Sequence, residues 1–282
     1  MSQFSIGVIL DSFRTDIYSA LDKASSLEGV KGFQVYATQG EMSPEQMDSQ
    51  KRKDFRKAVE DHGLTISALC GDLGHGFTNP QLNPQLIEKS KRILDLAVEL
   101  GTKIVTTHIG VVPEDPKDPR YSILQEACGQ LAEYADSLHA HFAVETGPEK
   151  ASVLGDFLDS LHSTGVAVNL DPANFIMVAQ DDPVQAVYRL KDYIVHTHAK
   201  DGRHLSQQDP TKLYSKSPEE ILADPSYIEL PLGQGDVDFP RYLHALKDVG
   251  YHGFLTIERE VGDDPEGDIS NAVEFLKNLI HS

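Results

Sequence analysis

Four ionisable side chains in the second half of the sequence could meet at one point. Each stands at the end of a short apolar segment: Glu145, Asp171, His198 and Glu258. Three carboxylates brought together would repel one another and lose hydration, so a cation must neutralise them. Three carboxylates and one imidazole suit Mn²⁺ best, with Mg²⁺, Co²⁺ and Zn²⁺ as alternatives. We therefore predict that these four residues bind one divalent metal ion.

The alternation of side chains along a strand puts the four residues in phase. Neighbouring residues of a strand point to opposite faces, so Glu145 lies opposite Val144. In each of the four segments, the ionisable residue falls on one face and the residue before it on the other. A single carboxylate at a strand end is more often a salt-bridge partner or a helix cap. Four in phase on consecutive strands indicate a shared ligand instead.

The elements that must position these residues repeat as a strand followed by an amphipathic helix. Strands are predicted at 4–10, 32–37, 64–70, 103–109, 141–146, 166–171, 193–199 and 253–258. Helical periodicity lies at 15–26, 44–62, 84–100, 120–139, 149–163, 183–191, 239–248 and 267–280. Eight such units favour parallel strands, right-handed crossovers and a closed barrel. The predicted fold class is α/β, a (β/α)8 TIM barrel that forms a single domain over residues 1–282.

Helix boundaries are marked by capping signals. A capping box with proline at the first helical position, Ser43–Gln46, is expected to begin the second helix. Glycines just past predicted helix ends are expected in the left-handed conformation: Gly63, Gly101, Gly165 and Gly250.

One connection is far longer than the ~2–6 residues normal between a strand and its helix. It covers residues 201–237 and contains a second capping box at Ser217–Glu220. A long loop after a strand lies on the face where barrel enzymes react, so it is predicted to be a lid or a pocket wall. An oligomer contact or an insertion without function is the alternative.

Composition excludes several classes of partner. The net charge is −19, and no basic stripe is evident, so neither nucleic acid nor an anionic membrane is expected to bind. No apolar run approaches ~20 residues, and the first residues resemble a strand and not a signal peptide. The two cysteines, Cys70 and Cys128, are expected to be free buried thiols in a reducing cytoplasm. We leave open whether the chain forms a homo-oligomer, either a dimer or a tetramer.

Several motifs resemble those of the sugar phosphate isomerase/epimerase family, the xylose-isomerase-like TIM barrels. They are AVETG (143–147), VNLDPAN (168–174), HTHAKD (196–201) and GFLTIERE (253–260). The resemblance implies that the four residues above are the metal ligands and that Glu145 and Glu258 are also the catalytic acid/bases. It further implies substrate-binding roles for His108, Asn174 and Arg203. Asn174 stands where several members have a histidine, and Arg203 is not in identical register.

The resemblance implies an isomerase or epimerase of a small sugar, such as a ketose, an aldose or a keto-sugar. The reaction would pass through a metal-stabilised enediolate with two glutamates as acid and base. One alternative is a dehydratase or lyase of a keto-sugar or inosose at the same site. A second is an abasic-site DNA endonuclease, with His75 and His108 as further metal ligands. A third is a binding protein that has no catalytic activity.

Overall fold

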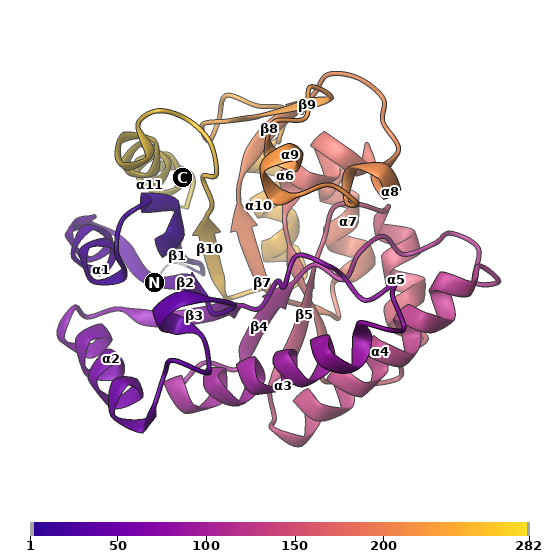
Figure 1. The fold of residues 1–282 in the computed structure, drawn as a ribbon. Coiled ribbons are helices and arrows are strands. Elements are labelled where there is room, and N and C mark those ends of the chain that lie inside the picture. The colour runs from indigo at the N-terminus through magenta and orange to yellow at the C-terminus, as the bar shows by residue number, and fades with distance from the viewer. Residues whose placement is uncertain (1–2, 281–282) are drawn as a thin grey trace.

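Eight parallel strands close into a barrel in the computed structural model, which describes residues 3–280 (Figure 1). The strands are β1 (Ser5–Ile9), β2 (Val30–Tyr36), β3 (Thr65–Cys70), β4 (Ile104–Thr107), β5 (His141–Glu145), β6 (Val166–Leu170), β7 (Ile194–Ala199) and β10 (Phe254–Ile257). Strand β10 pairs with both β1 and β7, which completes the ring. The predicted (β/α)8 barrel is therefore confirmed, and the strands differ from their predicted bounds only at the ends.

A helix follows each barrel strand and packs around the ring (Figure 1). These helices are α1 (Ile17–Ser26), α2 (Ser49–Asp61), α3 (Asn83–Leu100), α4 (Pro119–Ser137), α5 (Ala151–Asp159), α7 (Pro183–Leu190), α10 (Phe239–Asp248) and α11 (Pro265–Ile280). Apolar side chains from strands and helices form one continuous core. Both cysteines are buried and free, as predicted. Among the described residues, no helix is both long enough and apolar enough to cross a bilayer.

Two boundary predictions were wrong. Helix α2 does not begin at the capping box of residues 43–46 but at Ser49, because the Asp48 carboxylate accepts hydrogen bonds from the next free backbone N–H groups. Gly165 is not a left-handed helix cap, since α5 ends at Asp159. Gly165 instead allows a close approach to α4, where a Cβ atom would lie 2.0 Å from the Ala132 carbonyl oxygen. Gly63, Gly101 and Gly250 do have positive φ values, as predicted.

The connection between β7 and α10 contains two short strands and two short helices. The strands β8 (Asp201–His204) and β9 (Tyr227–Leu230) pair antiparallel, with α8 (Pro210–Leu213) and α9 (Pro218–Leu222) between them. This segment, residues 201–237, is called the long loop below. It lies above the C-terminal ends of the barrel strands (Figure 1). The capping box predicted at Ser217–Glu220 is present and begins α9.

The long loop is held to the barrel by one buried carboxylate at its start. Asp201 accepts backbone hydrogen bonds from Gly202 at 2.8 Å, from Gly233 and Gly235 at 2.9 Å and from Val237 at 3.1 Å. The two ends of the loop are thereby fastened together beside β7. If this loop acts as the lid that the sequence predicts, its two ends stay fixed and only the segment between them moves.

Candidate metal centre

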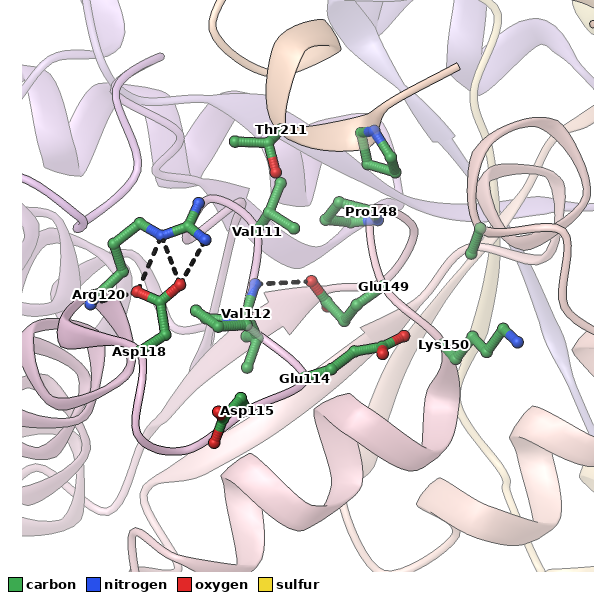
Figure 2. A pocket seen from close by; sticks show the side chains of 13 residues that line it. Val111, Val112, Glu114, Asp115, Asp118, Arg120, Pro148, Glu149, Lys150 and Thr211 are labelled. Carbon is green, nitrogen blue, oxygen red and sulfur yellow. Dashed lines mark hydrogen bonds and ion pairs between the residues drawn. The ribbon is translucent and has the colours of Figure 1, made fainter. Parts of the chain in front are cut away.

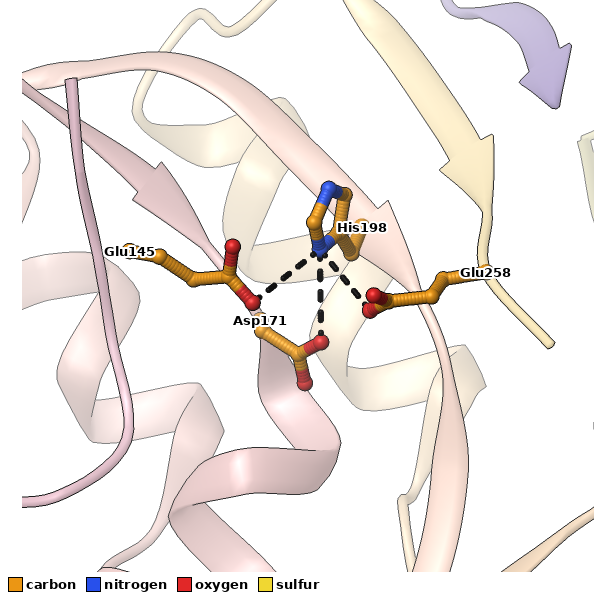
Figure 3. Close-up of side chains that lie close together, drawn as sticks. All are labelled: Glu145, Asp171, His198 and Glu258. Carbon is orange, nitrogen blue, oxygen red and sulfur yellow. Dashed lines mark ion pairs between the residues drawn. The ribbon is translucent and has the colours of Figure 1, made fainter. Parts of the chain in front are cut away.

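The four predicted ligands converge at the C-terminal mouth of the barrel (Figure 3). The Nδ1 atom of His198 lies 3.1 Å from Glu258 Oε2, 3.4 Å from Asp171 Oδ2 and 3.5 Å from Glu145 Oε1. All four donor atoms lie within 4.8 Å of one another. In Figure 3, Glu145 and Glu258 approach this point from opposite sides. The side chains predicted from strand alternation therefore share one location.

Strand register brings the four residues to the same height. They come from β5, β6, β7 and β10, which are consecutive neighbours in the ring. Leu170 is level with Thr197, so Asp171 and His198 follow side by side. Thr256 is level with His198, and the backbone N–H of Glu258 donates to Ala199. Because every strand runs in the same direction, the four ends meet at one edge.

The donor set has the properties of a metal site. All four residues are at most 6% exposed. Asp171 Oδ2 and Glu258 Oε2 are buried, and within residues 3–280 neither accepts a hydrogen bond. Buried carboxylate oxygens normally accept hydrogen bonds. Here they face only cationic groups among the described residues, His198 for both and Lys200 for Glu258, which makes them available to a metal ion. An imidazole nitrogen and three carboxylates match the ligands of a divalent ion such as Mn²⁺. The residues therefore fit the metal that the sequence predicts.

The ring of His198 is oriented by a residue that sequence analysis missed. Gln34, on β2, is buried, and its Oε1 atom lies 3.1 Å from His198 Nε2. The Gln34 carbonyl oxygen can accept a hydrogen bond from Nε2, and with the ring in this orientation Nδ1 faces the carboxylates. The sequence carries no signal for Gln34 beyond a polar residue within an apolar strand.

Electrostatics favours the charged forms of His198, Glu145 and Glu258. Burial by itself lowers the pKa of His198, but Glu258 and Glu145 outweigh it and raise the pKa well above its usual value. Burial raises the pKa of Glu145, yet His108 and His198 bring it below the usual value. Lys200 and His198 do the same for Glu258. Without a metal ion, the cluster therefore holds carboxylates around an imidazolium, and a bound ion would replace that proton.

A hydrogen-bonded layer supports the cluster from below. Asn169 donates to Glu145 Oε2 at 3.3 Å and accepts from His196 Nδ1 at 2.8 Å. The other nitrogen of His196 lies 3.1 Å from Ser67 Oγ and 3.0 Å from Thr256 Oγ1. His196 is therefore a buried supporting residue, one pleat below His198. Both of its ring nitrogens face partners outside the four-residue cluster.

Lys200 balances charge at the outer side of the cluster. Its Nζ atom lies 3.3 Å from Glu258 Oε2 and also pairs with Glu260. The amide of Glu260 donates in turn to Glu229, whose carboxylate binds Arg259 at 2.7 Å. This chain of charges fixes the end of β10 against the long loop. Glu258 is consequently held at both its backbone and its carboxylate.

Two of the three predicted substrate residues lie beside the cluster. His108 Nε2 is 3.7 Å from Glu145 Oε1, and its Nδ1 is 3.1 Å from Asp72. Asn174 donates to Glu145 Oε1 at 3.3 Å. That approach requires Gly147 of the AVETG motif, which has φ +147° and whose Cβ would lie 2.4 Å from Asn174 Cβ.

Arg203 is placed differently. It lies on β8, is about half exposed, and pairs with Asp236 at 2.9 Å. Within the described residues, no hydrogen bond or ion pair joins it to the four ligands. His75, offered by the endonuclease alternative as a further ligand, is exposed and stands outside the cluster.

A cavity of about 330 Å³ lies where the long loop meets the barrel (Figure 2). Its wall combines Val111–Arg120 after β4, Pro148–Lys150 after β5, and Pro210 and Thr211 of α8. On the barrel side of this seam, Glu149 joins the two segments, because its Oε2 accepts the backbone N–H of Val112 at 3.0 Å. Burial raises the pKa of Glu149 to about 8, so this carboxyl group is neutral through most of the physiological range.

An eight-stranded α/β barrel with an acidic cluster and one histidine at its mouth defines the class of this protein. Residues 21–279 match the model of the xylose isomerase-like TIM barrel family, and the chain belongs to that family. The resemblance found in the sequence motifs is thereby confirmed.

Individual relatives agree with this assignment. An uncharacterized protein of Methanocaldococcus jannaschii is 23% identical over 216 residues, which cover 70% of this chain and 64% of that protein. A xylose isomerase domain protein from Planctomyces limnophilus has a TM-score of 0.81 and 28% identity, over 98% of this chain and 97% of the other. A D-tagatose 3-epimerase-like protein has a TM-score of 0.74 and 16% identity, over 99% and 97%. The fold of this chain is thus a known architecture.

Proposed function

We propose that this protein is a divalent-metal-dependent isomerase or epimerase of a small sugar. The observation that carries the proposal is the placement of Glu145 and Glu258 on opposite sides of the same buried cluster (Figure 3). Two carboxylates in this arrangement can reach both faces of one carbon atom. Membership of the xylose isomerase-like family supports the same class of reaction.

The cluster of Glu145, Asp171, His198 and Glu258 would hold the ion, with Mn²⁺ as the preferred metal. When bound, such an ion supplies Lewis-acid polarisation of a carbonyl oxygen and a neighbouring hydroxyl. The chain itself supplies the ligands, keeps water out through burial and orients His198 through Gln34.

The two glutamates would transfer the proton. One of them removes the proton from the carbon beside the carbonyl group. Return by the same carboxylate to the adjacent carbon gives isomerisation, and delivery by the opposite one to the other face gives epimerisation. His108 and Asn174 contact Glu145 and are placed to bind substrate oxygens. Arg203 would reach the substrate only after leaving Asp236.

The test is hydrogen exchange with solvent in the Mn²⁺-loaded protein. Wild-type protein in D₂O should incorporate deuterium beside the carbonyl of at least one sugar in a panel of ketoses, inososes and 3-keto-glycosides, as measured by NMR. Glu145→Gln and Glu258→Gln should each slow this exchange by about 10²–10⁴-fold, the usual contribution of a general acid or base.

Controls separate the loss of a base from the loss of the metal. Metal content is measured for each variant, because both glutamates are also proposed ligands. Glu88→Gln, at an exposed position of α3, should behave as wild type. Unchanged exchange in both active-site variants would refute the proton-transfer roles. A product that has lost water or another leaving group would assign the site to a dehydratase or lyase instead.

A further inference from the structure

The long loop places one aromatic side chain over the metal centre. The ring of Tyr214, directly after α8, lies 5.6 Å from the ring of His108 at an interplanar angle of 45°. His108 in turn lies 3.7 Å from Glu145. Tyr214 is thus separated from a proposed metal ligand by a single side chain. None of the sequence motifs points to this residue.

The position of Tyr214 is fixed by its neighbours in the loop. The preceding residue, Leu213, is 1% exposed and anchors the segment in the core. Asp209 caps α8, and the backbone N–H of Tyr214 donates to Pro210 at 2.9 Å. Lys216 pairs with Asp224 at 2.5 Å on the far side. The phenol ring of Tyr214 is therefore carried by a segment of the long loop that is anchored on both sides of this residue.

The hydroxyl group of Tyr214 has no partner of its own. Within residues 3–280 it makes no hydrogen bond, although the side chain is more than half buried. Burial and the nearby carboxylates of Glu145 and Glu149 keep its pKa well above the usual value, so it remains a neutral donor. Tyr214 is only partly buried, and its hydroxyl oxygen is not one of the buried side-chain atoms that lack a partner, so water reaches it. A ligand oxygen at the barrel mouth would take the place of that water.

Packing on one side of α8 is incomplete. Pro210 and Thr211 line the cavity at the seam between the long loop and the barrel (Figure 2). The barrel side of that cavity is formed by the segments after β4 and β5. Leu213, by contrast, belongs to the hydrophobic core, and Tyr214 packs against that core.

We propose that Tyr214 is a substrate-contacting residue that donates a hydrogen bond to a polyhydroxylated ligand at the metal centre. Tyr214 would contact an oxygen in the part of the ligand that lies farther from the ion. The Tyr214 ring would cover this part of the ligand on the side of His108. This inference rests on the proposed function, because it assumes that a sugar or polyol binds at the cluster. It adds a specificity residue that acts from the loop and not from the barrel.

The first experiment measures polyol affinity. Mn²⁺-loaded protein is titrated calorimetrically with xylitol, ribitol, D-sorbitol and D-mannitol, which are unreactive analogues. For the polyol that binds tightest, Tyr214→Phe should weaken binding by up to about tenfold, the effect of one lost hydrogen bond, and leave Mn²⁺ affinity unchanged. Tyr227→Phe is the matched control, because that hydroxyl bonds to the Ile221 carbonyl inside the same loop. Wild-type polyol affinity in Tyr214→Phe would overturn the proposed contact.

The second experiment tests position without any sugar. The chain contains no tryptophan, so Tyr214→Trp introduces a single tryptophan, whose emission is excited selectively over that of the tyrosines. Mn²⁺ should quench its emission at one equivalent, whereas diamagnetic Mg²⁺ should not. Tyr188→Trp, at an exposed site on α7, should show no such quenching. If both variants bind Mn²⁺ and Mn²⁺ quenches their emission to the same extent, or quenches neither, the placement of Tyr214 is overturned. Wild-type protein that binds no Mn²⁺, or binds it but no polyol, would instead refute the proposed function.

Discussion

The metal cluster and the long loop lie face to face but are built in opposite ways. Every ligand stands at a barrel strand end, is at most 6% exposed and touches several buried polar partners. The long loop consists of short elements joined at their base by Asp201 and exposes the apolar side chains of Leu205, Leu222 and Ile228. Rigid strands keep ligand atoms in place, whereas a loop can change sequence and shape without disturbing them.

This contrast separates two tasks. In the proposed function, metal binding and proton transfer would need fixed distances, which a ring of strands provides. Selection among sugars would then fall to the loop, whose surface can change without moving the strand ends. The following predictions test that division, beginning with the change expected to have the largest effect.

Asp171→Asn should abolish metal-dependent stabilisation. Its Oδ2 faces the other donors without a hydrogen bond, and an amide nitrogen cannot replace it as a ligand. We expect Mn²⁺ affinity to fall at least about 100-fold, since even changes outside the ligand set cost that much. With Mn²⁺ at 100 times its Kd, the free energy of unfolding of the wild-type protein should rise by about 2.7 kcal/mol. EDTA should remove this gain. Calorimetric unfolding with each additive measures both effects.

The control for that experiment is Asp156→Asn on the outer helix α5, which should retain the full response to Mn²⁺. An equally large stabilisation of Asp171→Asn would mean that the ion binds elsewhere, and the comparison of the two regions would lose its basis.

Glu149→Gln should remove part of the pH dependence of stability. The pKa of this carboxyl is about 8 in the folded protein, against 4.5 as its ordinary value. The folded state therefore binds the extra proton between these pH values, and wild-type stability should fall as pH rises from about 4.5 to 8. Gln stays neutral at every pH. Over that pH range, the free energy of unfolding should therefore fall by roughly 1–3 kcal/mol less in the variant than in the wild type. Urea unfolding at pH 5 and pH 8.5 measures the difference.

Glu114→Gln is the matched control, because this residue lines the same cavity but is exposed. If Glu149→Gln kept the wild-type pH profile, the seam between the loop and the barrel would not contain a neutral carboxyl group.

Asp201→Asn should loosen the loop and spare the metal. One of the two oxygens that accept backbone hydrogen bonds becomes a donor, which breaks the clasp at Gly233 and Gly235 or at Gly202 and Val237. Amide hydrogen exchange at residues 233–237 should accelerate, while Mn²⁺ affinity changes by no more than about threefold. Asp182→Asn is the control, because Asn is also a good N-cap for α7. It should leave amide exchange at residues 233–237 unaltered. A parallel loss of Mn²⁺ affinity would show that the two regions are coupled.

The sequence predicted the ligands because two regularities determine where they point. Strand alternation fixes the face, and the common direction of parallel strands fixes the edge, so Glu145 and His198 could be placed without coordinates. Gln34 and Tyr214 follow neither rule. Gln34 comes from the opposite half of the ring, and Tyr214 comes from an irregular segment whose path depends on tertiary contacts such as that of Leu213.

The boundaries that failed have a similar explanation. The box at Ser43 was the predicted start of α2, but Ser43 ends a short 3-10 turn (Gly40–Met42), and the helix is capped five residues later by Asp48. Arg203 could not be placed because it lies within β8. The path of β8 is set by its pairing with β9, which comes more than twenty residues later in the sequence.

The closed ring also imposes an order on how the centre comes into being. The chain is made from its N-terminus, and the last ligand, Glu258, comes directly after the strand that seals the ring between β1 and β7. Until that strand has been synthesised, only three of the four ligands exist. A growing chain therefore cannot assemble the full cluster early, and the four-residue cluster is completed in the same event as the barrel.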